Sequence, residues 1–300
     1  MKPPPFDYAD PDSVEGVVAA LSSDPGAVVV AGGQSLVMAL NLRQVAPTLL
    51  VDLRHVPDLD AIALDGDSIV VGATATAAAL LSSDLLHGTD ALRRALRSVG
   101  HPQTRNRTTG GGTVALADPV AEVPTTLVAL GGSVSLAGPD GTRTIAADGW
   151  ITGPYATARA HDEIVVEVRF HVPKGPSSWR EFVRRRGTFP ITGACVSVEH
   201  LDGDPDAEVV AARIGLSGVA PTPVRSPEAE AALVGRPLDD AAIARAVDAA
   251  LDGTVPPAHP HATPAHRRAL AGATLRVALG DLRPGTTDRP GEAVPDGAAA

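Results

Sequence analysis

Short apolar blocks alternate with glycine- and proline-rich turns along most of the chain. Near the start, Val14, Val17, Val18 and Leu21 recur at helical spacing after Ser13, a residue type that caps helices. Residues 27–31 are a continuous apolar run, and residues 49–53 are apolar except for Asp52. They predict two buried strands around a short helix at 36–40. Residues 1–55 therefore predict a small βαβ-like subdomain.

Residues 56–175 predict a second subdomain that mixes hairpins with helices. Asp65-Gly66-Asp67 and the Gly-Pro-Asp-Gly run at 138–141 are both typical of turns between paired strands. Asp118–Pro119 favours a helix start, since proline is tolerated in the first helical turn. The predicted strands are 62–64, 68–71, 133–136, 142–145 and 164–170, and the predicted helices are 76–81, 92–99 and 118–130.

The last third of the chain predicts a separate α+β domain at 176–282, reached through a proline-rich linker at 172–178. Its predicted strands are 179–183, 193–198 and 209–216, and its predicted helices are 226–233, 239–251 and 263–279. From residue 283 to residue 300, proline, glycine, aspartate and alanine dominate, so we expect a disordered tail.

The overall charge and composition exclude several classes of function. The 300 residues include 25 Lys and Arg against 35 Asp and Glu, a net charge of −10, and aromatic residues make up 3%. Nucleic-acid binding needs basic surface or stacking aromatics, so we expect no nucleic-acid partner. No apolar run is long enough for a membrane span and no leader peptide is evident, so we expect a cytoplasmic protein.

Cysteine and histidine give no sign of a metal site. The one cysteine, Cys195, lies in an apolar strand-like run and excludes both an intrachain disulfide and a cysteine-ligated iron–sulfur cluster. His259, His261 and His266 are close in sequence, but the first two are separated only by a proline, unlike the i, i+4 pair of a helical site. We expect structural or solvent-facing roles for them and no metal.

Two glycine-rich segments carry the candidate chemistry. The first, at 30–36, follows a buried strand and enters a helix, where successive backbone N–H groups can bind phosphate. The second, at 105–113, has three consecutive glycines flanked by threonines and arginines, followed by Asp118. Taken alone, the first is more typical of a plain turn, and the second could be a flexible surface loop. Asp118 is equally compatible with a helix cap. Two such segments in different subdomains favour a ligand with two ends, such as a dinucleotide.

The two segments together resemble the FAD-binding medium subunits of molybdenum hydroxylases, the carbon monoxide dehydrogenase medium chain and xanthine dehydrogenase FAD-domain family. The similarity rests on AGGQSL at 31–36 and RNRTTGGGTVALADPVAEVP at 105–124. Further matching segments, in the same order, are VDLR at 51–54, DEIV at 162–165, RRRG at 184–187, GVAPTP at 218–223 and HATPAHRR at 261–268. The resemblance covers nearly the whole chain before the tail. It implies an α+β, two-subdomain FAD-binding fold of the PCMH/vanillyl-alcohol-oxidase type, followed by a small C-terminal domain with an antiparallel sheet and helices.

The resemblance also implies roles for individual residues. The first segment would hold the pyrophosphate, and the second would wrap the ribityl and flavin side. Asp118 would bind a hydroxyl, the Ile164 backbone would lie against the adenine, and Phe189 would cover the flavin ring. The implied FAD contacts are Ala31, Gly32, Gly33, Gln34, Ser35, Leu36, Thr108, Thr109, Gly110, Gly111, Gly112, Thr113, Asp118, Ile164 and Phe189.

Three positions depart from the family pattern. Gly110 replaces a bulky apolar residue, Gln34 stands where close relatives often have histidine, and Thr188 replaces a common acidic residue. A missing side chain at Gly110 is expected to loosen the wall of the flavin pocket.

The function implied by the resemblance is electron transfer within a complex. The FAD of this oxidoreductase would accept electrons from iron–sulfur clusters and pass them to an external acceptor. The expected partners are a molybdenum-cofactor large subunit and a [2Fe-2S] small subunit, in a dimer of heterotrimers. Two alternatives stay open: a stand-alone FAD-dependent oxidoreductase with its own substrate pocket, and a partner-binding scaffold that has lost its cofactor.

Overall fold

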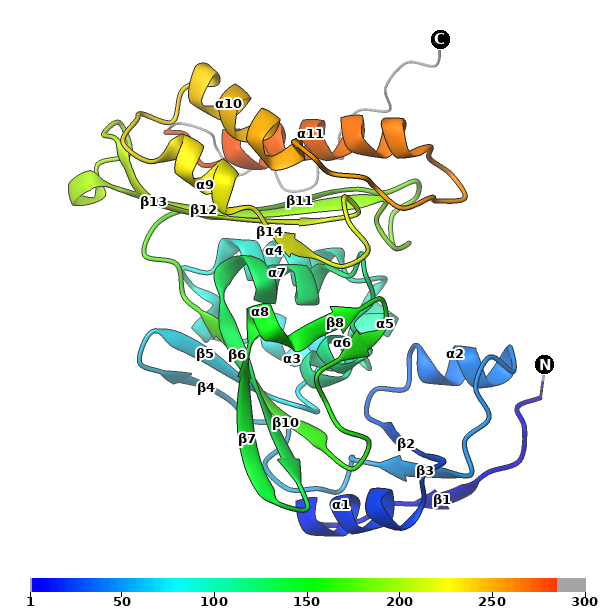
Figure 1. Ribbon diagram of the computed structural model, residues 1–300. Helices are drawn as coiled ribbons and strands as arrows, with labels where there is room; N and C mark the ends of the chain where they lie inside the picture. The colour runs from blue at the N-terminus through cyan, green and yellow to red at the C-terminus, as the bar shows by residue number, and fades with distance from the viewer. Residues whose placement is uncertain (1, 285–300) are drawn as a thin grey trace. The chain divides into compact units, whose positions relative to one another are not determined.

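The computed structural model describes residues 2–284, and these fall into two compact units (Figure 1). Within the described range, unit 1 comprises residues 2–85, 101–117 and 132–171, and unit 2 comprises 86–100, 118–131 and 172–284. Two helical segments predicted in the second subdomain, 86–100 and 118–131, thus belong with the C-terminal part of the chain. The predicted tail lies outside the described residues, apart from positions 283 and 284.

Unit 1 begins with a three-stranded sheet in the order β1-β3-β2, in which all neighbours are parallel. Its strands are β1 (Asp7–Ala9), β2 (Ala27–Val30) and β3 (Leu49–Asp52). Helix α1 (Val14–Ser23) starts where Ser13 Oγ accepts a hydrogen bond from the Gly16 N–H, and it buries the predicted apolar stripe. Helix α2 (Leu36–Asn41) connects β2 to β3. The predicted strand–turn–helix–strand order is confirmed.

The rest of unit 1 is built on an antiparallel five-stranded sheet, ordered β4-β5-β10-β6-β7. Both predicted hairpins are confirmed, since β4 pairs with β5 and β6 pairs with β7. The strands are β4 (Ile62–Asp65), β5 (Ser68–Gly72), β6 (Gly132–Gly138), β7 (Gly141–Ala146), β10 (Ile164–His171) and a small pair, β8 (Ile151–Gly153) and β9 (Ala156–Thr157). The helices are α3 (Ala77–Leu81), α5 (Pro102–Arg105), α6 (Gly110–Leu116) and α8 (Ala147–Trp150).

Unit 2 is a four-stranded antiparallel sheet covered by helices on both faces (Figure 1). Alternate residues of β12 explain the two covers, because Ala194 and Val196 pack with the C-terminal helices while Cys195 packs with α4 and α7. The strands are β11 (Ser177–Phe182), β12 (Thr192–His200), β13 (Val209–Ser217) and β14 (Val224–Arg225). The helices are α4 (Asp90–Ser98), α7 (Glu122–Leu130), α9 (Pro227–Leu233), α10 (Asp240–Leu251) and α11 (Pro264–Gly280), with 3₁₀ turns η1 (Asp84–Leu86) and η2 (Leu201–Gly203).

Three sequence predictions are corrected by the fold. The triple-glycine segment is the first turn of helix α6 and not a loop. The helix expected from Asp118 begins only at Glu122, because Asp118 and Ala121 close a separate turn through the Ala121 N–H and Asp118 C=O. Ser177 and Ser178 belong to strand β11 and not to a linker.

Candidate functional site

The first glycine segment lies at the carboxyl edge of the parallel sheet in unit 1. Strands β1, β2 and β3 run in the same direction, so Ala9, Val30 and Asp52 end at one edge. Residues 31–35 leave β2 at this edge and lead into α2. The carboxyl edge of parallel strands is where ligands bind in open α/β sheets.

Gly32 and Gly33 are required for two different reasons. A Cβ on Gly32 would lie 1.9 Å from the backbone oxygen of Arg107, so only glycine lets the two glycine-rich segments approach this closely. Gly33 has φ +71°, a conformation that L residues adopt at a cost. The sequence prediction of a tight Gly-Gly turn is confirmed, and its partner is the backbone of Arg107, within the second segment and before its glycines.

Four backbone donors in the first segment are unused. Among residues 2–284, the N–H groups of Gly32, Gly33, Gln34 and Ser35 form no hydrogen bond. The Ser35 side chain does not cap α2 either. Consecutive free N–H groups form a concave nest for an anion, and each charge-assisted bond contributes about 1.5–3 kcal/mol. Because α2 has only six residues, the amides and not a helix dipole carry this preference.

A hollow of about 730 Å³ opens beside the first segment, entirely within unit 1. Its wall combines the glycine turn, the apolar face of α2 and charged residues from the sheet edge. The lining residues are Phe6, Tyr8, Val30, Ala31, Gly32, Gly33, Gln34, Val37, Met38, Asn41, Leu42, Leu50, Asp52, Arg54 and Arg107.

A buried carboxylate organises the charged side of the hollow. Asp52 is 1% exposed and accepts from Tyr8 Oη at 2.8 Å and from Arg54 Nε at 2.7 Å. Its other oxygen accepts from the Arg54 N–H at 2.9 Å. The hydrogen bond to Asp52 raises the pKa of Tyr8, and the Asp52 charge raises the pKa of Arg54. Both groups therefore stay protonated at the rim. The Arg54 Nη groups can donate to a ligand, whereas the single O–H of Tyr8 is already donated to Asp52.

The second segment offers no free backbone donors after Thr109. The Gly110 N–H donates to Ala75 O at 2.9 Å and the Gly111 N–H to Ala73 O at 3.1 Å. The Gly112 N–H donates to Thr109 Oγ1 at 3.1 Å, which makes Thr109 the N-cap of α6. Ligand contacts from residues 110–113 would therefore come from the Thr113 hydroxyl or from the backbone surface, while Arg107 of the same segment lines the hollow.

Gly110 points toward the core of unit 1. A Cβ at this position would lie 2.9 Å from Val71 Cγ1, and a Cβ on Gly111 would lie 2.6 Å from Ala73 Cα. The geometry therefore favours a packing role for Gly110. It does not favour the expectation that a missing side chain at Gly110 loosens the wall of the flavin pocket.

The remaining candidates are divided between the two units. Ile164 starts β10 in unit 1 and is buried with Val17 and Leu21. Asp118 belongs to unit 2, where it is 6% exposed and accepts from the Val120 N–H. Phe189 also belongs to unit 2, in the β11–β12 connection, and its ring is 55% exposed.

The structure thus brings some of the predicted FAD contacts together at the hollow. It also places residues there that the sequence analysis did not predict. Ala31 to Gln34 line the hollow, Leu36 begins α2, and a Cβ on Gly32 would also approach Thr108 Cα. Tyr8, Arg54 and Arg107 were not predicted as site residues. The available signal was the Asp-Leu-Arg run directly after a buried strand, at an edge where parallel strands end.

Family comparison identifies the cofactor of this chain. Residues 4–174 match the model for the FAD binding domain in molybdopterin dehydrogenase, and residues 177–282 match that for the CO dehydrogenase flavoprotein C-terminal domain. The chain belongs to this family of FAD-binding oxidoreductases. The predicted cofactor, fold class and family are thereby confirmed.

Relatives of this flavoprotein cover nearly its full length. It is 37% identical to the 6-hydroxypseudooxynicotine dehydrogenase complex subunit alpha of Paenarthrobacter nicotinovorans, over 95% of this chain and 98% of that one. It is 34% identical to the carbon monoxide dehydrogenase medium chain of Afipia carboxidovorans, over 93% and 97%. The crystal structure of quinoline 2-oxidoreductase from Pseudomonas putida 86 superimposes with a TM-score of 0.90 at 32% identity, over 95% of this chain and 99% of that chain.

The residues of the first segment fit FAD. Its pyrophosphate is a compact dianion, and the free N–H groups of Gly32 to Ser35 with the open Cα of Gly33 form a matching nest. In the described residues, no group of three His, Cys, Asp or Glu side chains is placed to hold a metal ion. None of the described helices combines the length and apolar character needed to cross a membrane.

Proposed function

We propose that this flavoprotein is the electron-transfer subunit of a heteromeric molybdenum hydroxylase. It would accept electrons from iron–sulfur clusters of a [2Fe-2S] small subunit and pass them to an external acceptor, while a molybdenum-cofactor large subunit oxidises the substrate. The names of its relatives, which include a dehydrogenase complex subunit and a medium chain, support this assignment. We further propose a dimer of heterotrimers as the assembly.

The nest of four unused N–H groups is the observation that carries the proposal. In it, Gly32 to Ser35 would donate to the pyrophosphate oxygens, and Arg107 and Arg54 would add positive charge at the rim of the hollow. Bound FAD supplies the ability to take up and release two electrons, which no side chain of this chain provides. The chain's own task is to bind and orient it.

Cys195 supports the division of labour between subunits. It is the only cysteine, it is fully buried, and burial raises its pKa to about 12. An iron–sulfur cluster needs several thiolates, so clusters that reduce this FAD must belong to another chain. We retain Thr108 to Thr113, Asp118, Ile164 and Phe189 as proposed further contacts.

Replacing Gly32 tests the proposed pyrophosphate site. In Gly32→Ala the new Cβ would meet the Arg107 carbonyl at 1.9 Å, so the turn must move and the N–H nest is lost. We expect at least a tenfold loss of FAD affinity, measured by flavin absorbance after purification and by titration of the apoprotein. Gly149→Ala is the matched control in unit 1, because its Cβ would make only an ordinary 3.7 Å contact. A folded Gly32→Ala protein with normal FAD affinity would contradict the site.

A second measurement distinguishes the complex from a stand-alone oxidoreductase. Co-expression with neighbouring genes is expected to yield an assembly containing molybdenum, iron and FAD. A flavoprotein that purifies alone and whose FAD is reduced directly by a small substrate would favour the stand-alone enzyme instead.

A further inference from the structure

Positive charge is segregated in two stretches of unit 2. Residues 182–198 and 253–280 contain no aspartate or glutamate, although the whole chain has 35. The stretches carry the arginines at 184, 185, 186, 267, 268 and 276 and the histidines at 259, 261 and 266. In a chain with a net charge of −10, this creates a local field of the opposite sign.

The fold brings the two stretches together. Arg184 Nη1 lies 2.7 Å from His261 Nε2, which joins the β11–β12 connection to the segment before α11. Arg267, which is 3% exposed, donates to Ile191 O at 2.8 Å and to Pro257 O at 3.1 Å. The buried guanidinium thus fixes the backbones that carry the exposed basic groups.

No carboxylate neutralises this cluster. Within residues 2–284, Arg184, Arg185, Arg186 and Arg267 form no ion pair, and the bonds of Arg267 go to backbone carbonyls. Arg184, Arg185 and Arg186 are all exposed. Guanidinium groups bind phosphate and carboxylate through paired N–H donors, and the exposed groups of Arg184, Arg185 and Arg186 have no carboxylate partner in the part of the chain that the structure describes.

Two histidines complete the cluster as donors with fixed tautomers. His261 Nε2 must accept, because arginine has only donors, and His259 Nδ1 accepts from the His261 N–H at 3.2 Å. The neutral rings therefore carry their protons on His261 Nδ1 and His259 Nε2. Burial, and then the charges of Arg267, His261 and Arg184, hold the pKa of His259 below its usual range. Each ring therefore offers one N–H donor in its neutral form.

The segment that holds these histidines is stiff. Prolines at 256, 257, 260 and 264 fix φ along it, and His259 pairs with Ala262 in an isolated bridge. The two imidazole rings lie 5.6 Å apart in an edge-to-face arrangement. Donors held this closely suit one small, highly charged oxyanion, because little ordering is left to occur on binding.

We propose that Arg184, Arg185 and Arg186, with His259 and His261, form a binding site for a phosphate group. The ligand class is a phosphate-bearing small molecule, either free pyrophosphate or a nucleotide. The five residues belong to unit 2 and none of them is a proposed FAD contact, whereas the glycine nest belongs to unit 1, so a variant of the nest tests the two sites separately.

Calorimetric titration of the FAD-saturated full chain tests the site with inorganic pyrophosphate and ADP as probes. Arg184→Gln/Arg185→Gln/Arg186→Gln is expected to weaken pyrophosphate binding at least tenfold. The control Lys174→Gln/Arg236→Gln/Arg245→Gln removes the same charge from exposed positions of the same unit. It is expected to change the affinity for pyrophosphate less than twofold. Tighter binding of ADP than of pyrophosphate identifies a nucleotide, and equal binding identifies the phosphate alone.

Nitrogen-15 chemical shifts of the histidine rings report direct contact with the ligand and do not respond to a general change in surface charge. Pyrophosphate is expected to shift the signals of His261 Nδ1 and His259 Nε2, and to do so equally in Gly32→Ala, where the glycine nest is lost. Equal loss of affinity in both triple variants, absence of these shifts, or tighter binding of a polyglutamate peptide than of either probe would overturn the proposal. The last result would identify an acidic protein surface instead.

Discussion

Adjacent glycines in this chain serve different physical purposes. Gly33 supplies a positive φ, whereas Gly32 admits the Arg107 carbonyl. Gly111 allows α6 to start against the backbone of Ala73, with its own N–H bonded to Ala73 O. Glycine is a poor helix former, so the helix at Gly110–Leu116 exists because tertiary contacts and the Thr109 cap outweigh propensity.

Gly111→Ala tests this packing account. Its Cβ would lie 2.6 Å from Ala73 Cα and 2.8 Å from Ala73 O, neither of which can move without the backbone. We expect a loss of about 1–3 kcal/mol in the free energy of unfolding of unit 1, despite the gain in helix propensity. Trp179→Phe leaves Trp150, which lies in unit 1, as the only tryptophan, so its fluorescence can follow urea denaturation. Gly149→Ala, in helix α8, is expected to be neutral or slightly stabilising.

The sequence predicts the site only as far as local pattern reaches. The strand–turn–helix around Gly32 follows from an apolar run and two glycines, and the carboxyl edge follows from parallel strands. The contact of Gly32 with Arg107 joins residues far apart in sequence, so no local pattern contains it. The bond from Tyr8 to Asp52 is hidden for the same reason. The predicted Gly110 loop failed because packing against β5 overrides intrinsic preference.

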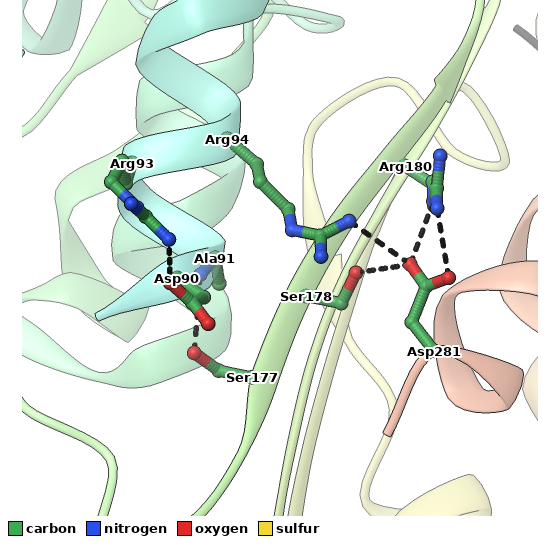
Figure 2. A network of polar contacts seen from close by, with 8 residues as sticks. All are labelled: Asp90, Ala91, Arg93, Arg94, Ser177, Ser178, Arg180 and Asp281. Atoms are coloured by element: carbon green, nitrogen blue, oxygen red, sulfur yellow. Dashed lines mark hydrogen bonds and ion pairs between the residues drawn. The ribbon is translucent and has the colours of Figure 1, made fainter. Parts of the chain in front are cut away.

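At the scale of elements, one carboxylate ties three parts of unit 2 together (Figure 2). Asp281, at the end of α11, accepts from Ser178 Oγ at 2.6 Å and from both Arg180 Nε and Nη2 of β11, at 2.7 and 2.8 Å. Arg94 Nη1 of α4 reaches the same carboxylate at 3.4 Å. Helices on opposite faces of the sheet are therefore joined through its first strand. In Figure 2, Arg94, Ser178 and Arg180 all donate to Asp281, while Arg93 donates to Asp90 and the Ala91 N–H donates to Ser177, so the Asp281 carboxylate connects α4, β11 and the end of α11.

Asp281→Ala is expected to destabilise unit 2 by about 3 kcal/mol. The Asp281 side chain is 11% exposed and the Arg180 side chain 17%, so removal of the carboxylate leaves two largely buried guanidiniums without their shared anion. Asp240→Ala is the control, because its pair with Arg283 is 94% exposed on the aspartate side and is worth less than about 1 kcal/mol. In a Trp150→Phe background, the unfolding of unit 2 is followed through Trp179. Equal losses of unfolding free energy in Asp281→Ala and Asp240→Ala would contradict the proposed role of Asp281 in connecting these elements.

At the scale of the whole molecule, the two units respond to pH in opposite directions. In unit 1, hydrogen bonds from Thr48 lower the pKa of Asp24, and those from Arg143 lower the pKa of Glu163. Carboxyls with lowered pKa stabilise a fold above their unfolded pKa, and that stability is lost as pH falls through the folded value. Unit 1 is therefore expected to weaken in acid.

Unit 2 contains the opposite arrangement. Burial, followed by the charge of Glu181, raises the pKa of Glu122 to about 8, and burial raises the pKa of Glu181 to about 7. The charges near Glu122 are those of Glu181 and Asp118, while Trp179 Nε1 donates to Glu181 at 3.1 Å. Within residues 2–284, neither the buried Glu122 nor the partly buried Glu181 forms an ion pair, and their charges repel each other, so the folded state keeps protons that the unfolded state has released.

Unit 2 is consequently expected to lose stability as pH rises from 5 to 8. Between the unfolded pKa of 4.5 and the folded values, each retained proton contributes a slope of about 1.4 kcal/mol per pH unit. Denaturation midpoints at pH 5, 6, 7 and 8, followed through Trp179, measure this slope. Glu122→Gln cannot ionise, so it is expected to flatten the profile and to be more stable than the parent at pH 8, whereas the exposed Glu208→Gln is expected to keep the parent slope. A flat parent profile would show that this pair ionises freely in the folded protein, and a Glu122→Gln profile as steep as the parent's would show that other groups cause the slope.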